Sequence, residues 1–240
     1  MSTLLVIRHG QASFGAADYD VLSSRGEEQS RRLGAYLERA GVRPDVVITG
    51  PRARQIDTAR HMSSAPAFAD ATVEPRFDEF PAFEIVAAAL PTLLASGELS
   101  PARRAAYEAA ARDPVRERQG FEDMFRDIMR RWAEDDPVLA PALAELESFA
   151  AFRARVLEGM RALMRARGRG RTIVVVTSAG TVGASLAAAL SLSPWDSIKA
   201  SLVVANTAIT TFKYRDPADV SLGNFNAHPH LTDRALVTLR

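Results

Sequence analysis

The tripeptide Arg8-His9-Gly10 directly follows an apolar run, residues 4–7, near the N-terminus. A cation and an imidazole at the end of a buried strand lie where open α/β sheets bind their ligands. Arginine offers a planar fork suited to phosphate, and histidine can act as a nucleophile or proton carrier near neutral pH. Glycine lets the backbone approach an anion closely. These residues predict a phosphate-handling enzyme with His9 as its nucleophile.

Two further polar segments follow predicted strands. Residues 50–54 come after the apolar segment 45–49, and Ser178-Ala179-Gly180 follows the continuously apolar segment 172–177. Because the carboxyl ends of parallel strands share one edge of a sheet, we expect all three polar segments to meet in one pocket. The backbone amides near Ala179 and Gly180, at a predicted helix start, would add neutral donors for an anion.

Alternation of strands and helices predicts an α/β fold, a three-layer αβα sandwich around a mostly parallel sheet. We expect helices at 23–39, 53–62, 145–167 and 181–190. Further strands are expected at 73–77 and 235–239, with two more within 201–214 on either side of Asn206-Thr207. Residues 85–140 are rich in Ala, Arg and Glu, and the prolines at 91, 101, 114, 137 and 141 are expected to divide them into short helices. We interpret residues 1–240 as a single domain with a helical insertion at about 85–140.

The chain has 240 residues, a formal net charge of +1 and no cysteine. This balance of charge gives no indication of a nucleic acid or a membrane as a partner. The lack of cysteine excludes disulfides, thiolate nucleophiles and cysteine-ligated zinc. The histidines at 9, 61, 228 and 230 form no zinc-like pattern with carboxylates, so no metal and no other cofactor is expected.

The N-terminal segment carries no signal-like pattern, and no apolar stretch reaches the roughly 18 residues that a membrane span needs. We therefore expect a cytoplasmic protein whose partner is a small phosphomonoester or a phosphate anion. The strand predicted at 235–239, at the edge of the sheet, would permit a homodimer.

Several of these segments resemble signatures of the histidine phosphatase superfamily, which has the phosphoglycerate mutase-like fold. Arg8-His9-Gly10 matches its opening motif, and residues 50–59 resemble its pattern S-x-L-x-R-A-x-Q-T-A, in which the matching arginine is Arg54. Glu79 falls where the family places a proton donor after the third strand. Weaker likenesses cover Asp18-Tyr19-Asp20 with Leu22-Ser23, Glu147-Ser148, and Asn206-Thr207 with Thr210.

One departure concerns the second catalytic histidine of the family, which normally follows the fourth strand in the pattern S-H-G. This chain has Ser178 at that position, as do some branches of similar sequence. A hydroxyl donates one neutral hydrogen bond, and losing a charged, pre-organised donor can cost roughly 10²–10³ in rate. We therefore expect a slower enzyme with an intact phosphate pocket.

The resemblance implies that His9 attacks a phosphomonoester and forms a phosphohistidine that water then hydrolyses. Arg8 and Arg54 would hold the equatorial oxygens, and Ser178 and Ala179 would contribute further phosphate contacts. Glu79 would protonate the leaving oxygen and then activate water.

Some assignments stay open at this point. Arg52 is a rival to Arg54, and Asp78 and Glu84 are alternatives to Glu79 as the acid. His228 and His230 flank Pro229, where we expect surface histidines; the sharper alternative is that one of them replaces the missing imidazole.

The function predicted is hydrolysis of a small phosphomonoester. The alternative is a weak or inactive pseudophosphatase that binds a phosphorylated ligand. A phosphoglycerate mutase-type transfer is less favoured, because a mutase must retain the phosphoenzyme and Ser178 weakens the hold on phosphate. The arginines at 103–104, 116, 118 and 130–131 would extend a polyanion site or lie on solvated helix faces, the latter being the default interpretation.

Overall fold

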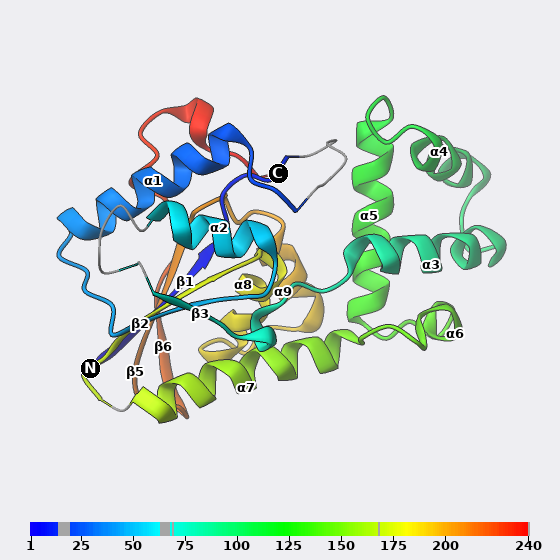
Figure 1. The fold of residues 1–240 in the computed structure, drawn as a ribbon. Helices are drawn as coiled ribbons and strands as arrows, with labels where there is room; N and C mark the ends of the chain where they lie inside the picture. The colour runs from blue at the N-terminus through cyan, green and yellow to red at the C-terminus, as the bar shows by residue number, and fades with distance from the viewer. Residues whose placement is uncertain (14–19, 63–67, 69, 168, 240) are drawn as a thin grey trace. The chain divides into compact units, whose positions relative to one another are not determined.

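The computed structural model describes residues 1–240 except 14–19, 63–67, 69, 168 and 240. The described residues form a six-stranded sheet of order β3-β2-β4-β1-β5-β6 (Figure 1). Its strands are β1 (Ser2–Arg8), β2 (Val46–Thr49), β3 (Ala71–Val73), β4 (Thr172–Thr177), β5 (Ile209–Asp216) and β6 (Asp219–Ala227). The first four run parallel to one another, and β5 and β6 are antiparallel additions beside β1. The mostly parallel α/β fold is therefore confirmed.

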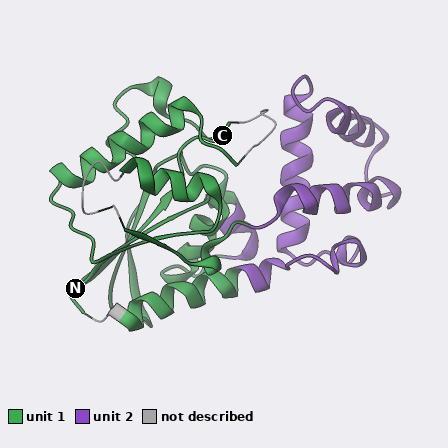
Figure 2. Ribbon diagram, viewed as in Figure 1, with its two compact units in different colours: residues 1–79, 153–192, 199–240 green, residues 80–152, 193–198 purple. Residues whose placement is uncertain are grey.

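The chain divides into two compact units (Figure 2). The sheet unit comprises residues 1–79, 153–192 and 199–240, and the helical unit comprises residues 80–152 and 193–198. The helical unit contains α3 (Ala82–Ala95), α4 (Pro101–Arg112), α5 (Arg118–Ala133) and α6 (Ala140–Leu143). It begins earlier and ends later than the insertion predicted at about 85–140.

The prolines of the helical unit do not all interrupt helices. Pro101 begins α4, but Pro91 lies inside α3 and Pro141 lies within the first turn of α6. Proline removes the hydrogen bond to the carbonyl four residues earlier, here that of Ala87, and both Pro91 and Ala87 are exposed. Water can therefore satisfy this carbonyl, and the prediction that Pro91 ends a helix is wrong.

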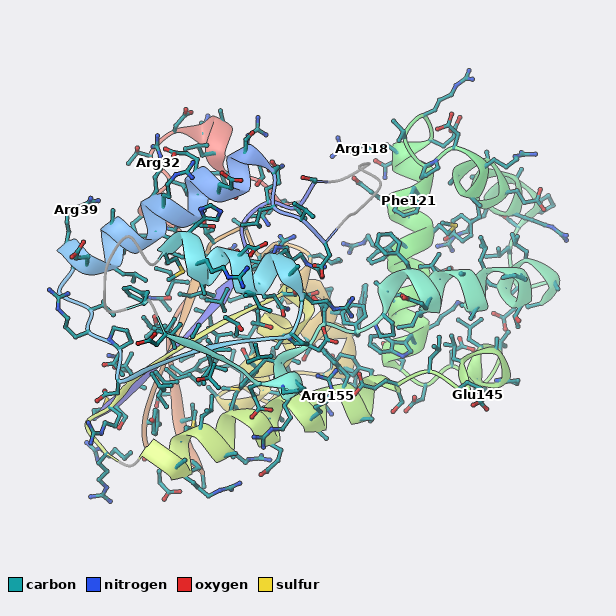
Figure 3. The ribbon with its side chains drawn as sticks, in the orientation of Figure 1. Arg32, Arg39, Arg118, Phe121, Glu145 and Arg155 are labelled. Carbon is teal, nitrogen blue, oxygen red and sulfur yellow. The ribbon has the colours of Figure 1, made fainter. Side chains whose placement is uncertain are left out.

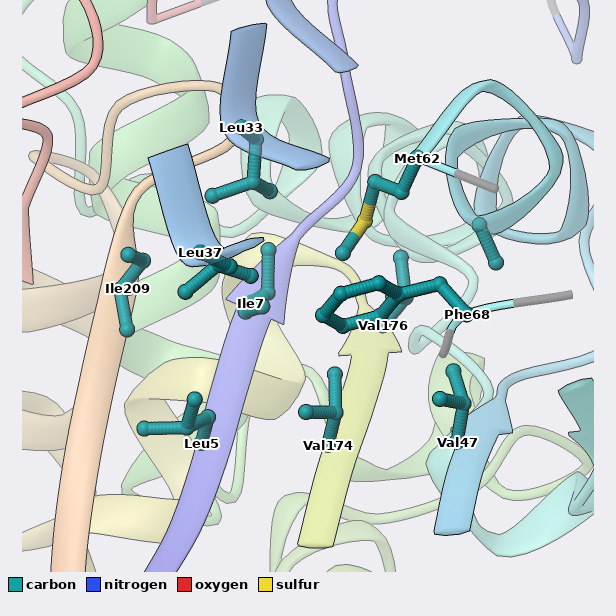
Figure 4. Close-up of a cluster of buried hydrophobic side chains, with 11 residues drawn as sticks. Leu5, Ile7, Leu33, Leu37, Val47, Met62, Phe68, Val174, Val176 and Ile209 are labelled. Atoms are coloured by element: carbon teal, nitrogen blue, oxygen red, sulfur yellow. The ribbon is translucent and has the colours of Figure 1, made fainter. Parts of the chain in front are cut away.

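One face of the sheet is covered by α1 (Ser24–Arg39) and α2 (Ala53–Met62), both within one or two residues of their predicted bounds. Alternate residues of β1, Leu5 and Ile7, pack with Leu33 and Leu37 of α1 in the core cluster shown in Figure 4. Burial of each such side chain stabilises the fold by about 1.5–3 kcal/mol. This packing fixes the position of the helix starts relative to the strand ends.

The long helix α7 (Phe149–Arg167) begins later than predicted. The Ser148 hydroxyl accepts a hydrogen bond from the Ala151 N–H, so the serine caps the helix and residues 145–147 lie outside it. Residues 153–167 of α7 belong to the sheet unit, on the side opposite α1 and α2 (Figure 1).

Two predicted strands are not formed. Residues 201–208 are the end of α9 (Pro194–Ser201) and a turn, and residues 234–236 are a short 3₁₀-helix with no strand after it. In the segment 234–236 the Asp233 carboxylate accepts a hydrogen bond from the Ala235 N–H, which favours a turn over an extended chain. The C-terminal strand prediction is therefore wrong, and the edge next to β5 is β6.

Two segments near the site also differ from prediction. After β3 the chain forms a 3₁₀-helix, Pro75–Phe77, where an extended piece was expected, because the Glu74 side chain caps it. After β4, α8 (Ala179–Ser185) starts two residues earlier than predicted and continues as a 3₁₀-helix over Leu186–Ala188. Among the described helices, none has the length and apolar character needed to cross a bilayer.

Candidate active site

The carboxyl ends of β1, β4 and β2 lie next to one another at one edge of the sheet. Arg8 pairs in register with Thr177, and the His9 N–H donates to the Thr177 carbonyl at 2.7 Å. The Gly50 N–H in turn donates to the Val176 carbonyl at 3.0 Å. The predicted convergence of the three polar segments is therefore confirmed, because sheet pairing places their first residues side by side.

The His9 imidazole is 4% exposed and both of its ring nitrogens have defined partners. Nδ1 lies 2.7 Å from the Gly10 carbonyl oxygen, which can only accept, so Nδ1 carries the proton. Nε2 lies 3.1 Å from Nε of Arg54, which can only donate. The neutral ring therefore presents its lone pair at Nε2, the arrangement that a nucleophilic imidazole requires.

The surroundings of His9 favour this neutral form. Burial lowers the pKa of the imidazole well below its usual value near 6.5, and the charges of Arg54 and Arg8 lower it further. The hydrogen bond to Gly10 opposes the shift but does not reverse it. The His9 imidazole is consequently unprotonated at neutral pH.

Arg54 lies in the first turn of α2 and is held by Asp20. Nη1 of Arg54 lies 2.7 Å from one carboxylate oxygen of Asp20, and the other oxygen accepts from the Ala53 N–H at 2.9 Å. The carboxylate thus satisfies a free amide at the helix start and fixes the guanidinium beside His9. The sequence motif Asp18-Tyr19-Asp20 did not indicate this role for Asp20. Asp18 and Tyr19 lie outside the described residues.

Arg52 and Asp78, two of the rival assignments, pair with each other. Nε of Arg52 lies 2.6 Å from Oδ1 of Asp78, and this oxygen also accepts from the Glu79 N–H at 2.7 Å. Arg54, in contrast, contacts His9 directly. The geometry favours Arg54 over Arg52 as the arginine that acts with His9.

The Glu79 carboxylate accepts a hydrogen bond from the Gly180 N–H at 2.8 Å. This contact joins the segment after β3 to the start of α8, one residue beyond Ala179. The Gly180 amide predicted as an anion donor is therefore occupied by Glu79. Glu84, the third candidate acid, is an exposed residue of α3 in the helical unit.

Arg155 of α7 orders the segment that leads to Glu79. Its guanidinium donates to the carbonyls of Arg76 at 3.0 Å and Asp78 at 3.2 Å. Figure 3 labels this side chain on α7. Three neighbouring backbone groups are thereby held by one side chain, because the Pro75 carbonyl accepts from it as well.

Arg8 is buried, and its guanidinium contacts backbone carbonyls. Its Nη1 donates to the carbonyl of Val204 and, at 2.8 Å, to the carbonyl of Leu239. These bonds tie the end of β1 to the C-terminal segment. The charge of Arg8 nevertheless acts on the imidazole, as its effect on the pKa of His9 shows.

Ser178 is 1% exposed and contacts Gln55, a residue that the sequence analysis did not assign to the site. Nε2 of Gln55 donates to Oγ of Ser178 at 2.8 Å. The signal was present in the sequence: Gln55 replaces the Ala that follows the arginine in the family pattern S-x-L-x-R-A-x-Q-T-A, just as Ser178 replaces its histidine.

Gly10 is required by packing against α1. A Cβ atom there would lie 2.5 Å from the Gly26 carbonyl oxygen, closer than van der Waals contact. The Gly10 N–H donates to Thr58 Oγ1 at 2.9 Å. The close approach predicted at this glycine is thus to a helix of the same chain.

The His9 carbonyl is fixed from behind by Asn206 and Thr207. Nδ2 of Asn206 donates to it at 3.1 Å, and the Thr207 N–H donates to it at 3.3 Å. Thr207 has φ +59°, a left-handed conformation that is strained for a β-branched residue. This strained turn supports the backbone of His9.

His230 is buried, so the prediction of a surface histidine is wrong for this residue; His228 is half-buried. Nε2 of His230 lies 2.8 Å from Thr207 Oγ1, and the ring packs against Tyr36. Burial, followed by the charges of His228 and Arg32, lowers the pKa of His230 to about 4. A neutral ring at pH 7 does not replace the charge of the missing imidazolium.

Among the described residues, no group of three or more His, Cys, Asp or Glu side chains could hold a metal ion.

Comparisons with known proteins give a consistent result. A family model described as the histidine phosphatase superfamily (branch 1) matches residues 4–87 and 116–223. The 2,3-bisphosphoglycerate-dependent phosphoglycerate mutase of Thermobifida fusca (strain YX) is 47% identical over 66 residues, which are 25% of this chain and 26% of that protein. The match therefore spans about a quarter of that relative's length.

Solved structures are similar over nearly the whole chain. Phosphoserine phosphatase from Entamoeba histolytica, in complex with 3-phosphoglyceric acid, has a TM-score of 0.64 at 19% identity, covering 96% of this chain and 100% of that one. Phosphoglycerate mutase from Bacillus anthracis has a TM-score of 0.64 at 16% identity, with coverages of 96% and 95%. A mycobacterial glucosyl-3-phosphoglycerate phosphatase has a TM-score of 0.60 at 20% identity, with coverages of 94% and 98%. At such identities the likeness establishes a shared fold.

Proposed function

The chain belongs to the histidine phosphatase superfamily, and from this premise we propose that it hydrolyses small phosphomonoesters through a phosphohistidine formed on His9. The observation that carries the proposal is the buried, neutral imidazole whose Nε2 lone pair lies 3.1 Å from Arg54 Nε. Phosphoryl transfer is catalysed mainly by positioning the nucleophile and by cations that stabilise charge on the phosphoryl oxygens.

In the first step, Nε2 of His9 forms a bond to phosphorus while the bond from phosphorus to the ester oxygen breaks. The Nε–H of Arg54 turns from the imidazole to a phosphoryl oxygen, where charge spreads in the transition state. The protonated carboxyl of Glu79 gives its proton to the leaving alkoxide, which departs as an alcohol. The proton on Nδ1 stays in place, hydrogen-bonded to the Gly10 carbonyl.

In the second step, the Glu79 carboxylate takes a proton from water as the water oxygen attacks phosphorus. The bond from phosphorus to Nε2 breaks, inorganic phosphate leaves, and the neutral His9 imidazole is regenerated. The contact between Glu79 and the Gly180 amide supports this role, because it holds the carboxyl at the same sheet edge as His9.

Hydrolysis of p-nitrophenyl phosphate tests the proposal. We expect measurable turnover by the wild type and none by His9→Ala above background. Brief reaction with a ³²P-labelled phosphomonoester, followed by alkaline quench, should trap an acid-labile phosphoenzyme in the wild type only.

The control variant is His61→Ala, which removes a histidine of α2 that makes no contact assigned to the site. It should retain wild-type turnover and phosphoenzyme. Equal turnover by His9→Ala and the wild type would contradict the proposal.

A second candidate is a pseudophosphatase that binds a phosphorylated ligand without turnover. The replacement of the second imidazole by Ser178 favours it, because a neutral donor stabilises transition-state charge less than a cation. Binding of inorganic phosphate by the wild type, with no phosphoenzyme and no p-nitrophenol released, would support this candidate over the first.

A further inference from the structure

Gln55 connects the start of α2 to Ser178 through two hydrogen bonds. Its side-chain oxygen accepts from the Arg52 N–H at 3.0 Å, as the third residue of a helix does in a capping box. Its side-chain nitrogen donates to Ser178 Oγ at 2.8 Å. Gln55 itself is fully buried.

The direction of both bonds is determined by chemistry. A backbone N–H can only donate, so the oxygen of the Gln55 amide must face Arg52 and the NH₂ group must face Ser178. An amide NH₂ also only donates, so Ser178 Oγ accepts, and its own hydrogen must point elsewhere. Within the described residues Ser178 Oγ has no second partner, and this side chain does not cap α8.

Ser178 and His9 are neighbours at the sheet edge, since each follows directly on one residue of the register pair Arg8 and Thr177. Consecutive residues of α2 contact them: Arg54 contacts His9, and Gln55 contacts Ser178. One helix turn therefore orients both groups.

We propose that Gln55 is a positioning residue that directs the hydroxyl hydrogen of Ser178 toward a phosphoryl oxygen held at His9. Ser178 then acts as a neutral phosphate donor that does not titrate. This inference rests on the proposed function for the identity of the anion, but it concerns how the site binds that anion whether or not turnover follows.

Gln55 and Ser178 pack together as one unit. The family pattern quoted above has Ala where this chain has Gln55, and His where it has Ser178. It also has Ser where this chain has Gly50, and a Cβ at Gly50 would lie 2.2 Å from Oε1 of Gln55 and 2.5 Å from the Phe77 carbonyl oxygen. Positions 50, 55 and 178 meet at the Gln55 amide, which occupies space that a side chain at position 50 would need.

A double-mutant cycle between Gln55→Glu and Ser178→Ala tests the proposal. A carboxylate at position 55 accepts from the Ser178 hydroxyl and turns its hydrogen away from the phosphate, with almost no change in shape. When Gln55→Glu is combined with Ser178→Ala, the same charge is introduced but no hydroxyl is present. The cycle therefore separates donor direction from charge repulsion.

The readouts are kcat/KM for p-nitrophenyl phosphate and the dissociation constant for inorganic phosphate measured by calorimetry. Because a hydrogen bond to a charged group is at stake, Ser178→Ala should weaken either readout by about 10- to 100-fold. Gln55→Glu should cost at least about ten times more in the wild-type background than in the Ser178→Ala background. Equal costs in the two backgrounds would overturn the proposal.

The pH profile of the cycle gives a further readout. The ratio of wild-type to Gln55→Glu activity should decrease as pH falls and the introduced carboxyl is protonated, and it should decrease more than the ratio of Ser178→Ala to the double variant, which carries the same charge but no hydroxyl. A ratio that does not change with pH would count against the proposal.

The two proposals fail differently. If the wild type binds phosphate but shows no turnover, the proposed function fails while the cycle is still measured through phosphate binding. If the wild type does not bind phosphate, the positioning role is overturned as well.

A swap tests the packing unit. Ser178→His alone places a ring carbon where Oγ now lies 2.8 Å from the Gln55 amide, so it should lower activity. Adding Gln55→Ala should recover at least about ten-fold, as the ring gains room to donate a charge-assisted bond. Equal activity of the single and double variants, both folded by thermal unfolding, would contradict the coupling.

Discussion

Each compact unit has a cluster in which arginines lie close to a buried titratable side chain. In the sheet unit the central group is the His9 imidazole, 3.1 Å from Arg54. In the helical unit it is the Asp127 carboxylate, whose side chain is 2% exposed and lies within ion-pair distance of Arg103, Arg130 and Arg131.

The difference lies in the central group. Around Asp127 the positive charges face negative ones, because Arg131 also pairs with Glu98 and Asp136, so three arginines meet three carboxylates. Around His9 the central group is a neutral base, and the arginines lower its pKa. Positive charge beside a neutral base attracts an anion, whereas positive charge beside a buried carboxylate pairs within the fold.

The same comparison explains the arginine-rich segments of the helical unit. Arg104 pairs with Glu108 and Arg118 pairs with Glu122 along their own helices. These pairs fit the default interpretation of solvated helix faces. Arg103 and Arg130 are half-exposed, but both reach the buried Asp127, a contact that charge counting along the sequence does not predict.

The largest effect is expected from removing the cation next to the nucleophile. Arg54→Met should lower kcat/KM for p-nitrophenyl phosphate by about 10²–10³-fold, the usual cost of one pre-organised donor to transition-state charge. The matched control is Arg60→Met on the same helix, where the side chain is exposed and pairs with Asp57. If the two variants retain the same activity, Arg54 does not act on an anion at His9, and the difference proposed between the two clusters is wrong.

The buried imidazole of His230 should make the protein less stable in acid. The pKa of His230 is lowered to about 4 in the folded state, mainly by burial, and returns to about 6.5 on unfolding. The unfolded state therefore binds the extra proton first, and stability falls as pH drops from about 6.5 to about 4. This residue contributes a loss of up to about 3 kcal/mol.

Urea unfolding at several pH values measures that loss. His230→Gln should show a flatter dependence of the free energy of unfolding on pH than the wild type over this range. His9, Glu28 and Glu74, whose pKa values are also lowered, contribute to the slope that remains. A His230→Gln curve parallel to that of the wild type would contradict the assignment.

Asp127→Asn addresses the compensated cluster. The variant keeps the size of the side chain but leaves Arg131, which is 14% exposed, with less negative charge nearby. Because the other arginines are half-exposed, we expect a loss of about 1–2 kcal/mol in stability and no change in kcat/KM of the folded enzyme. Glu108→Gln, at a surface pair, is the control, with a change within about 0.5 kcal/mol. Loss of activity without loss of stability would place Asp127 in the site.

The elements that hydropathy determines could be predicted from the sequence. The segment 172–177 is apolar throughout because β4 lies between β1 and β2 and is buried on both faces, and it was predicted with its observed bounds. The strand predicted at 235–239 fails because one side-chain hydrogen bond from Asp233 forms a turn that hydropathy does not reveal.

In the site, the sequence predicted which segments meet but not which atoms pair. His9, Arg54 and Ser178 come together because strand order alone brings their segments to one edge. The Gly180 amide bonds Glu79, a residue 101 positions away, and Gln55 bonds Ser178 across 123 positions. Such contacts depend on side-chain packing between elements, which has no periodic signal in the sequence.

The smallest effect is expected at Arg52, the residue that competed with Arg54 on sequence grounds. Its ion pair with Asp78 is about a third exposed on both sides, at 35% and 32%, so solvent screens it and Arg52→Gln should cost at most about 1 kcal/mol of stability. Asp78 still accepts from the Glu79 N–H, so Glu79 keeps its place and kcat/KM should fall only a few-fold. Steady-state kinetics should compare kcat/KM of Arg52→Gln with that of Arg54→Met, two variants at positions within one helical turn of each other. A larger loss for Arg52→Gln would reverse the assignment, because both arginines pair with a carboxylate and only Arg54 also contacts the imidazole.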